Sequence, residues 1–451
     1  MGPERTGDAV GRPTANKTPL NLGDGAAFRL KSGRELARAL LVLRLCALPP
    51  LVRHAGTILA ASRRVLGRRL WGGLLRATFY GQFVGGETPR ELAAAGARLR
   101  ALGLRPMLAV PTEGEGQDHD GERWYESNRG AMRECVGLAA ATGPHPMMQL
   151  KVTALMSPRL CWGATHIFFF RKETVSLRLE EGAELTPERV EAVMGGEVAA
   201  FPCLTPAENR HLGASLRRLD DVVGFAASRG VRVLVDAEQN SVNPALSLAT
   251  AALMGRHNGA EPWVWNTYQA YLRDGRRRLL GDAEAARRRG VCFGVKLVRG
   301  AYLEHERRRA RAGGRPDPVH PTLQETHRSY GECLEAALAL AARDGPRVGV
   351  MVATHNEDSV RQAAARMEAL GIPRRDGSVC FAQLLGMSDH VSLALGQAGF
   401  AVYKSVPYGA AEAALPYLAR RAQENRGVLG ANGRERHLLA RELRRRLLRR
   451  P

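Results

Sequence analysis

The chain has 451 residues, of which 45% are hydrophobic and 25% charged, and its formal net charge is +21 at pH 7. This composition is ordinary for a soluble globular protein, and the length allows two or three domains or one large α/β barrel. None of the seven cysteines forms a CxxC motif and no apolar run approaches the ~20 residues of a membrane span, which favours a reducing compartment and argues against a spanning helix.

The basic surplus is concentrated in two places. Eleven Lys and Arg residues face a single acid, Glu35, between Arg29 and Arg76, and the segment 441–450 reads RELRRRLLRR. Such blocks bind nucleic acid or an anionic membrane surface, or they are simply solvated. No RNP-like motif or zinc-finger spacing accompanies them, so we expect no nucleic-acid partner. Peripheral membrane contact or internal targeting remains open for the first block.

In chain order, the composition predicts four regions. Residues 1–26 are rich in Gly, Pro and Thr and are expected to be disordered, whereas 27–110 has helical periodicity, with Thr88-Pro89 as a plausible helix start. After a polar loop, residues 145–435 alternate short apolar runs with helical patterns, and 436–451 form a basic tail.

The alternation in 145–435 is typical of a parallel sheet, and eight strand–helix units favour a (β/α)₈ barrel. The stretch THIFFFRKETVSLRLE (165–180) fits neither period, so the order of elements around it stays open. An eighth strand is expected near AAFPCL (199–204). The other seven strands are expected within 147–155, 231–239, 263–272, 291–302, 347–356, 379–387 and 401–409.

The expected strands finish in polar groups, which in a barrel would meet at one mouth. The sequence contains no Ser–His–acid spacing, no HExxH or paired-His metal motif, and no GxGxxG after a strand, so a hydrolase, a metal site and a Rossmann site are not expected. Most of the groups are hydrogen-bond donors and suit an anionic cofactor. They are Lys151, Asp236, Glu238, Asn266, Gln269, Lys296, Arg299, Thr354, His355, Asn356, Gln383 and Ser405.

A helical pattern follows the last strand. Tyr417, Arg420 and Arg421 lie three and four positions apart and would share one face. Paired guanidinium groups suit a carboxylate or a phosphate, although a solvated basic face has the same pattern. The residues alone thus predict a barrel enzyme with an anionic cofactor and a carboxylate substrate.

Four strings in order resemble the proline dehydrogenase family: KLVRGAY (296–302), VATHN (352–356), YKSVPYG (403–409) and YLARRAQEN (417–425). The resemblance runs from about Leu150 to Gly430, with 157–185 poorly matched. It implies a distorted (β/α)₈ barrel with FAD at its C-terminal mouth, oxidation of the ring of proline or hydroxyproline, and electron transfer to quinone. It also implies a mitochondrial location on the matrix side of the inner membrane, which the acidic residues of the N-terminus do not favour.

The resemblance also assigns roles to individual residues. Arg420 and Arg421 would grip the substrate carboxylate, with Glu424 steering them, Lys151 would add a third cation, and Asp236 would lie in the same mouth. Further substrate contacts would come from Tyr302, Leu385 and Tyr417. The positions expected to contact the flavin are Gln269, Lys296, Val298, Gly300, Ala301, Thr354, His355 and Asn356.

Ser405 is the informative departure, because family members specialised for proline have Tyr there, near C4 of the substrate. A serine leaves room for a C4 substituent and offers it a hydrogen bond. We therefore predict oxidation of trans-4-hydroxy-L-proline to 1-pyrroline-3-hydroxy-5-carboxylate, with oxidation of L-proline to 1-pyrroline-5-carboxylate as the alternative. A flavin barrel reductase for a folate-like substrate and a basic, non-enzymatic interaction protein are the other hypotheses.

Overall fold

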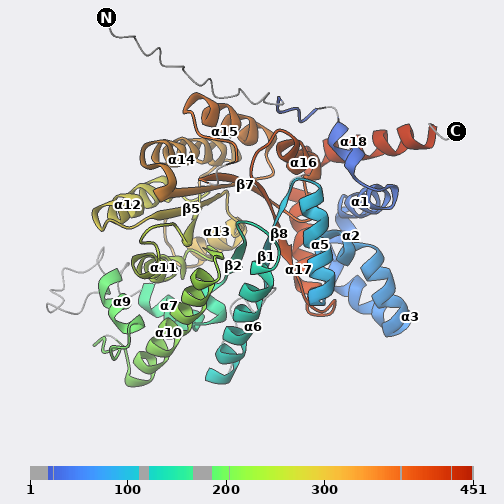
Figure 1. Ribbon diagram of the computed structural model, residues 1–451. Helices are drawn as coiled ribbons and strands as arrows, with labels where there is room; N and C mark the ends of the chain where they lie inside the picture. Colours follow the sequence, from blue (N-terminus) through green and yellow to red (C-terminus); the bar gives the residue numbers. More distant parts are fainter. Residues whose placement is uncertain are drawn as a thin grey trace, which may run out of the picture.

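The computed structural model describes residues 19–23, 25–110, 121–165, 185–202, 204–375, 378–427 and 429–448 (Figure 1). The side chains of 60, 162–165 and 422–432 are not part of this description. Nearly all of the irregular stretch 165–180, and residues 1–18 of the segment expected to be disordered, therefore lie outside the described residues.

Eight parallel strands form a closed barrel in chain order, with β8 pairing back to β1. The predicted (β/α)₈ barrel is thus confirmed. Its strands are β1 (Arg105–Ala109), β2 (Met147–Leu150), β3 (Arg232–Val235), β4 (Val264–Gln269), β5 (Phe293–Val298), β6 (Val348–Ala353), β7 (Val379–Leu384) and β8 (Val402–Pro407).

The prediction of an eighth strand at 199–204 is wrong, because that strand is β1 at 105–109, within the region expected to be helical. The apolar residues of 199–204 are instead buried in a loop: Phe201 is 1% exposed, and its backbone N–H donates to the Asn209 side chain at 2.9 Å. The segment resembled a strand because it is a short apolar run that would complete the count of eight. The true strand begins with Arg105 and Pro106, which concealed it.

Helices surround the barrel in its outer layer (Figure 1). Three of them, α5, α10 and α14, begin with a Thr/Glu capping box, including the predicted start at Thr88. The outer helices are α5 (Pro89–Ala101), α6 (Glu122–Ala140), α7 (Pro158–Thr165), α9 (Pro187–Met194), α10 (Pro206–Ser228), α11 (Asn243–His257), α12 (Gly275–Arg288), α14 (Leu323–Asp344), α15 (Glu357–Ala369) and α16 (Asp389–Gln397). Helix α13 (Leu303–Ala312) precedes α14 and in Figure 1 is drawn over the middle of the barrel rather than around its rim.

A tightly packed apolar layer fills the lower part of the barrel. Trp265 on β4 is fully buried there, among residues that include Met107, Leu234 and Tyr403. A Cβ atom at Gly294 would lie 2.4 Å from the Trp265 ring, so the neighbouring strand needs glycine to accommodate the indole. This apolar layer fills the barrel near the N-terminal ends of the strands, and the polar residues lie at the C-terminal ends, which form the mouth.

The remaining helices join the two ends of the chain beside the barrel. Helix α17 (Leu415–Gly427) follows β8 and packs against α1 (Gly33–Cys46), α2 (Pro49–Arg53), α3 (Ala55–Ala77), α4 (Phe79–Phe83) and α18 (Leu429–Leu448). Figure 1 shows these blue and red helices side by side. The N-terminal region therefore supports the helix that carries Arg420 and Arg421.

Candidate active site

Four inward-facing polar side chains form a continuous chain of contacts just above the apolar layer. Ser405 on β8 donates its hydroxyl hydrogen to Gln149 Oε1 on β2. Gln149 Nε2 donates to Asp236 Oδ1 at 3.1 Å, and Lys296 Nζ lies 2.6 Å from the same oxygen. Three residues named from the sequence are thereby brought together across the barrel.

Gln149 is the member of this chain that the sequence interpretation missed. It lies two residues before Lys151, and side chains two residues apart in an extended strand point to the same face. That period-two relation was the available signal. It acquires meaning only when β2 is known to lie across the mouth from β8, with β1 between them.

A second polar cluster lies where β2, β3 and β4 end. Gln269 Nε2 donates to the backbone carbonyl of Glu238 at 3.0 Å. The Glu238 carboxylate accepts from Thr153 Oγ1 at 2.8 and 2.9 Å, and Glu238 is only 6% exposed. The Glu238 side chain thus links the loop after β2 to the loop after β3, and its backbone carbonyl holds the Gln269 amide in place.

Arg299 organises the ends of β5 and β6. Its Nη1 and Nη2 atoms donate to Thr354 Oγ1 at 2.8 Å and to Ser359 Oγ at 2.9 Å, and its guanidinium lies 4.2 Å from the centre of the Tyr330 ring. The next residue, Gly300, has φ +123°, and an added Cβ would lie 1.9 Å from the Tyr271 ring. Only glycine fits this turn, which carries Ala301 and Tyr302 to the mouth.

His355 follows β6 and contacts Ser388 Oγ through Nδ1 at 3.1 Å. Burial, and then the positive charges of Lys404 and Arg421, lower the pKa of His355 from 6.5 to about 3. The imidazole is therefore neutral at physiological pH and is suited to hydrogen bonding rather than to carrying charge. The influence of Arg421 also places this α17 residue in the electrostatic environment of the strand ends.

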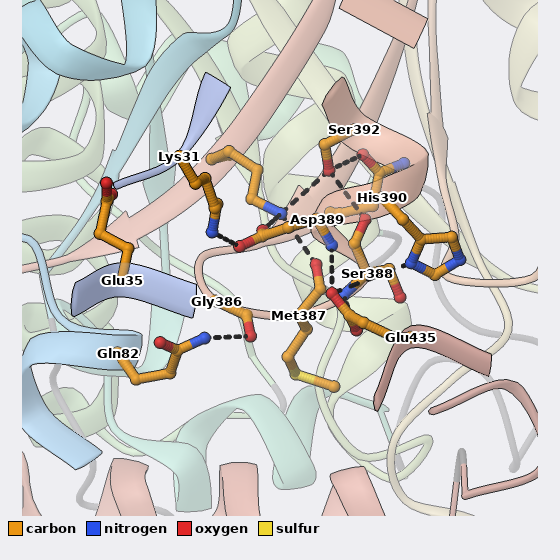
Figure 2. A network of polar contacts seen from close by, with 12 residues as sticks. Lys31, Glu35, Gln82, Gly386, Met387, Ser388, Asp389, His390, Ser392 and Glu435 are labelled. Carbon is orange, nitrogen blue, oxygen red and sulfur yellow. Dashed lines mark hydrogen bonds and ion pairs between the residues drawn. The ribbon is translucent and has the colours of Figure 1, made fainter. Parts of the chain in front are cut away.

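A buried ionic cluster holds the loop between β7 and α16. Lys31, which precedes α1, contacts Asp389, and Lys404 Nζ lies 2.8 Å from the other Asp389 carboxylate oxygen. Although burial raises the pKa of Asp389, the two ammonium groups outweigh it and hold that pKa well below its usual range. Figure 2 shows Lys31, Asp389 and Glu435 meeting at this loop.

The opposite side of that loop is fixed by backbone contacts. Glu435 on α18 accepts hydrogen bonds from the backbone N–H groups of Ser388 at 3.0 Å and Asp389 at 2.7 Å, and Gln82 Nε2 donates to the Gly386 carbonyl at 2.9 Å (Figure 2). Both ends of the chain thus position the loop that carries Leu385. The backbone N–H of Leu385 in turn donates to the Ser405 carbonyl at 3.0 Å.

The helix α17 carries the predicted carboxylate-binding residues. The Arg421 guanidinium stacks 4.8 Å from the centre of the Tyr417 ring, and Arg421 is 4% exposed. Arg420, the residue before it, is half-buried. The face shared by Tyr417 and Arg421 is therefore a packed one rather than a solvated basic surface. The side chain of Glu424 lies outside the described part of the structure.

Two polar residues expected at the mouth face the outer helices instead: Asn266 Nδ2 donates to Ser247 Oγ on α11 at 3.3 Å, and Gln383 Oε1 accepts from Ser392 Oγ on α16 at 2.8 Å. That part of the prediction is wrong, because these side chains alternate to the outer face of β4 and β7.

Other predicted site residues lie at strand ends around the mouth. Lys151 directly follows β2, Val298 ends β5, and Tyr302 precedes α13. Asn356 caps α15, where its side chain accepts a hydrogen bond from Ser359. Among the residues that the structure describes, no group of three or more His, Cys, Asp and Glu could hold a metal ion.

The chain is similar to known proteins over most of its length. A family model described as proline dehydrogenase matches residues 92–432. A bovine protein (Bos taurus) named hydroxyproline dehydrogenase is 56% identical over 95% of this chain and 94% of its own length, and the human (Homo sapiens) protein of that name is 55% identical over 94% and 93%. Human mitochondrial proline dehydrogenase 1 is 32% identical over 97% of this chain and 92% of its own length.

A solved structure of proline utilization A (PutA) from Bdellovibrio bacteriovorus shares the fold, with a TM-score of 0.61 and 20% sequence identity. The similarity covers 90% of this chain and 36% of that longer chain. At this identity the likeness concerns the fold alone. Together with the family model and the relatives of 50–56% identity, the findings agree. The chain therefore belongs to the proline dehydrogenase family, within the branch that contains the hydroxyproline dehydrogenases.

Proposed function

We propose that this protein is an FAD-dependent dehydrogenase that oxidises trans-4-hydroxy-L-proline to 1-pyrroline-3-hydroxy-5-carboxylate. The observation that carries the choice of substrate is Ser405, which places a small hydroxyl on the inner face of β8, 7% exposed, in the upper layer of the barrel. The names of the relatives with 50–56% identity support the same choice.

The donor set at the ends of β4, β5 and β6 fits an anionic flavin nucleotide. Lys296 and Arg299 supply positive charge, Gln269 an amide, and Thr354 and His355 neutral polar groups. These residues, with Val298, Gly300, Ala301 and Asn356, would hold FAD. When bound, FAD would supply the oxidising power by accepting the hydride that leaves C5 of the substrate.

The protein side chains would then orient the substrate. Arg420, Arg421 and Lys151 would bind the carboxylate through charge-assisted hydrogen bonds, with Glu424 steering the arginines. Tyr302, Leu385 and Tyr417 would bound the ring, and Ser405 would face C4. The ring nitrogen gives up its proton as C5 loses hydride, so the residues need to fix orientation rather than act as a strong base.

We further propose that electrons pass to a quinone at the matrix side of the mitochondrial inner membrane. Helix α3 supports a membrane contact, because it exposes Val65, Leu70 and Leu74 (84%, 72% and 54% exposed) beside the exposed arginines 63, 64, 68 and 69. This combination suits an anionic bilayer surface. No helix in the described ranges is long and apolar enough to cross a membrane.

Co-sedimentation with cardiolipin-containing vesicles tests the membrane contact. Replacing Leu70 and Leu74 together by Glu should abolish binding while the enzyme still oxidises its substrate with a soluble dye. Equal binding by the variant would exclude α3 as the contact.

An anaerobic flavin titration tests the activity. Purified protein should be yellow, and trans-4-hydroxy-L-proline should bleach the flavin absorbance, whereas NADH should not. Bleaching by NADH would favour the reductase hypothesis. Colourless protein that binds nucleic acid would favour a non-enzymatic role, and efficient bleaching by L-proline alone would favour the proline alternative.

A further inference from the structure

We propose that Gln149 is a specificity-determining positioning residue, which fixes the Ser405 hydroxyl as a hydrogen-bond acceptor toward the substrate. The pocket would therefore select a C4 substituent that donates a hydrogen bond, not merely one that fits. This inference rests on the proposed function, because it concerns the same pocket.

The direction of the hydrogen bonds is set at the Lys296 end of the chain. Lys296 Nζ lies 2.6 Å from Asp236 Oδ1, and an ion-paired carboxylate can only accept hydrogen bonds. The Gln149 amide lies 3.1 and 3.4 Å from the two Asp236 oxygens. Its NH₂ group must face them, because a carbonyl oxygen in that place would meet a carboxylate at close range.

The orientation of Gln149 then decides the orientation of Ser405. With NH₂ directed to Asp236, the amide carbonyl is directed to Ser405, so the serine must donate its one hydroxyl hydrogen to Gln149 Oε1. With its hydrogen engaged, the Ser405 oxygen can only accept a hydrogen bond, through its remaining lone pairs. A serine without this partner could rotate and either donate or accept.

The chemical consequence concerns the C4 substituent of the substrate. A 4-hydroxyl group can donate to Ser405 and complete the chain from Lys296 outward. A fluorine, methoxy or keto group at C4 can only accept, so it would oppose the fixed lone pairs of Ser405. Proline has no group there and would leave the serine oxygen without its substrate partner.

Four proteins test the coupling: wild type, Gln149→Leu, Ser405→Ala and the double variant, each assayed with trans-4-hydroxy-L-proline and L-proline. In Gln149→Leu, the ratio of kcat/KM for hydroxyproline to that for proline should fall about three- to tenfold, the value of one oriented neutral hydrogen bond. In the Ser405→Ala background, adding Gln149→Leu should leave the ratio unchanged, since the effect acts through Ser405.

Taking the ratio of two substrates removes general damage to the site. Equal losses of kcat/KM for both substrates would show that Gln149 is only structural and would overturn the inference. So would the same change of ratio in the presence and absence of Ser405. Flavin absorbance of each variant reports whether the protein has folded and loaded its cofactor. If the wild type oxidises no hydroxyproline, the proposed function fails instead.

A second pair of substrates tests the direction of the Ser405 hydrogen bond without any substitution at Gln149. Wild type should oxidise trans-4-hydroxy-L-proline with a higher kcat/KM than trans-4-fluoro-L-proline. The ratio of these two values should be about three- to tenfold larger in wild type than in Ser405→Ala. If the two enzymes show the same ratio, Ser405 does not discriminate a donor from an acceptor and the inference is wrong.

Discussion

In the proposed function, single side chains at the barrel mouth would bind either the substrate carboxylate or the substrate ring. Arg421 is stacked on Tyr417 and 4% exposed, so its removal would disturb packing as well as charge. Arg420 beside it is half-buried and is the cleaner probe of carboxylate binding. The proposed role of the pair therefore rests on a test at Arg420.

Arg420→Ala should raise KM for hydroxyproline on the order of 10- to 100-fold, because a charge-assisted hydrogen bond to the carboxylate is lost. Steady-state kinetics measure KM, and the absorbance of the purified variant measures its flavin content. Flavin should stay bound. Arg444→Ala, at an exposed position of α18, is the control and should behave as wild type. An unchanged KM in Arg420→Ala would remove the assigned role.

Among whole elements, the loop between β7 and α16 depends on contacts that are remote in the sequence. Lys404 is 1% exposed on β8 and would be costly to bury alone, but its ammonium group pairs with the Asp389 carboxylate, which also contacts Lys31. Lys31 and Asp389 are 358 residues apart. Such a cluster cannot be predicted from residues that are close in the sequence.

Asp389→Ala should destabilise the protein by about 3–5 kcal/mol, because it leaves two ammonium groups buried without their carboxylate. Urea denaturation gives the free energy of unfolding. Glu284→Ala is the matched control: it breaks exposed ion pairs with Arg287 and Arg288, and should lower the free energy of unfolding far less than Asp389→Ala does. Equal losses in the two variants would show that the buried cluster contributes no more than a surface pair.

Elements also show what the sequence could predict and why. The seven correctly predicted strands are apolar runs that finish in polar groups, and this pattern is visible in the residues themselves. β1 was missed because Arg105 and Pro106 precede its apolar residues. The loop at Phe201 was predicted to be a strand because its residues are apolar, as a strand's are, and in the structure they are buried in a loop. Gln149 was missed because its importance depends on which strands meet across the barrel.

At the scale of the whole molecule, the N-terminal helices and α18 join the barrel through titratable groups. His390 lies 3.0 Å from Glu357 and 3.8 Å from Glu435, its side chain 4% exposed. Burial lowers the pKa of His390, but the hydrogen bond to Glu357 and the negative charges of Glu357 and Glu435 outweigh this and raise it from 6.5 to about 9. The protonated imidazole thus ties α16 to α15 and α18.

Because the folded-state pKa is raised, the contribution of His390 to stability should be fully present below about pH 6.5 and lost as the pH rises toward 9. The loss should be on the order of 1–3 kcal/mol. Thermal unfolding at pH 6 and pH 9 measures it, with His390→Gln as the comparison. The variant should lose less stability than wild type over this range. Identical pH dependence would show that His390 is not the group responsible.

The central claim is that this barrel is built for a hydroxylated proline ring, and the ratio of kcat/KM for trans-4-hydroxy-L-proline to that for L-proline tests it most directly. Wild type should favour hydroxyproline, and Ser405→Tyr should shift the ratio toward proline by filling the space at C4. A wild-type enzyme that oxidises L-proline with the higher kcat/KM, or a ratio that Ser405→Tyr leaves unchanged, would contradict the account.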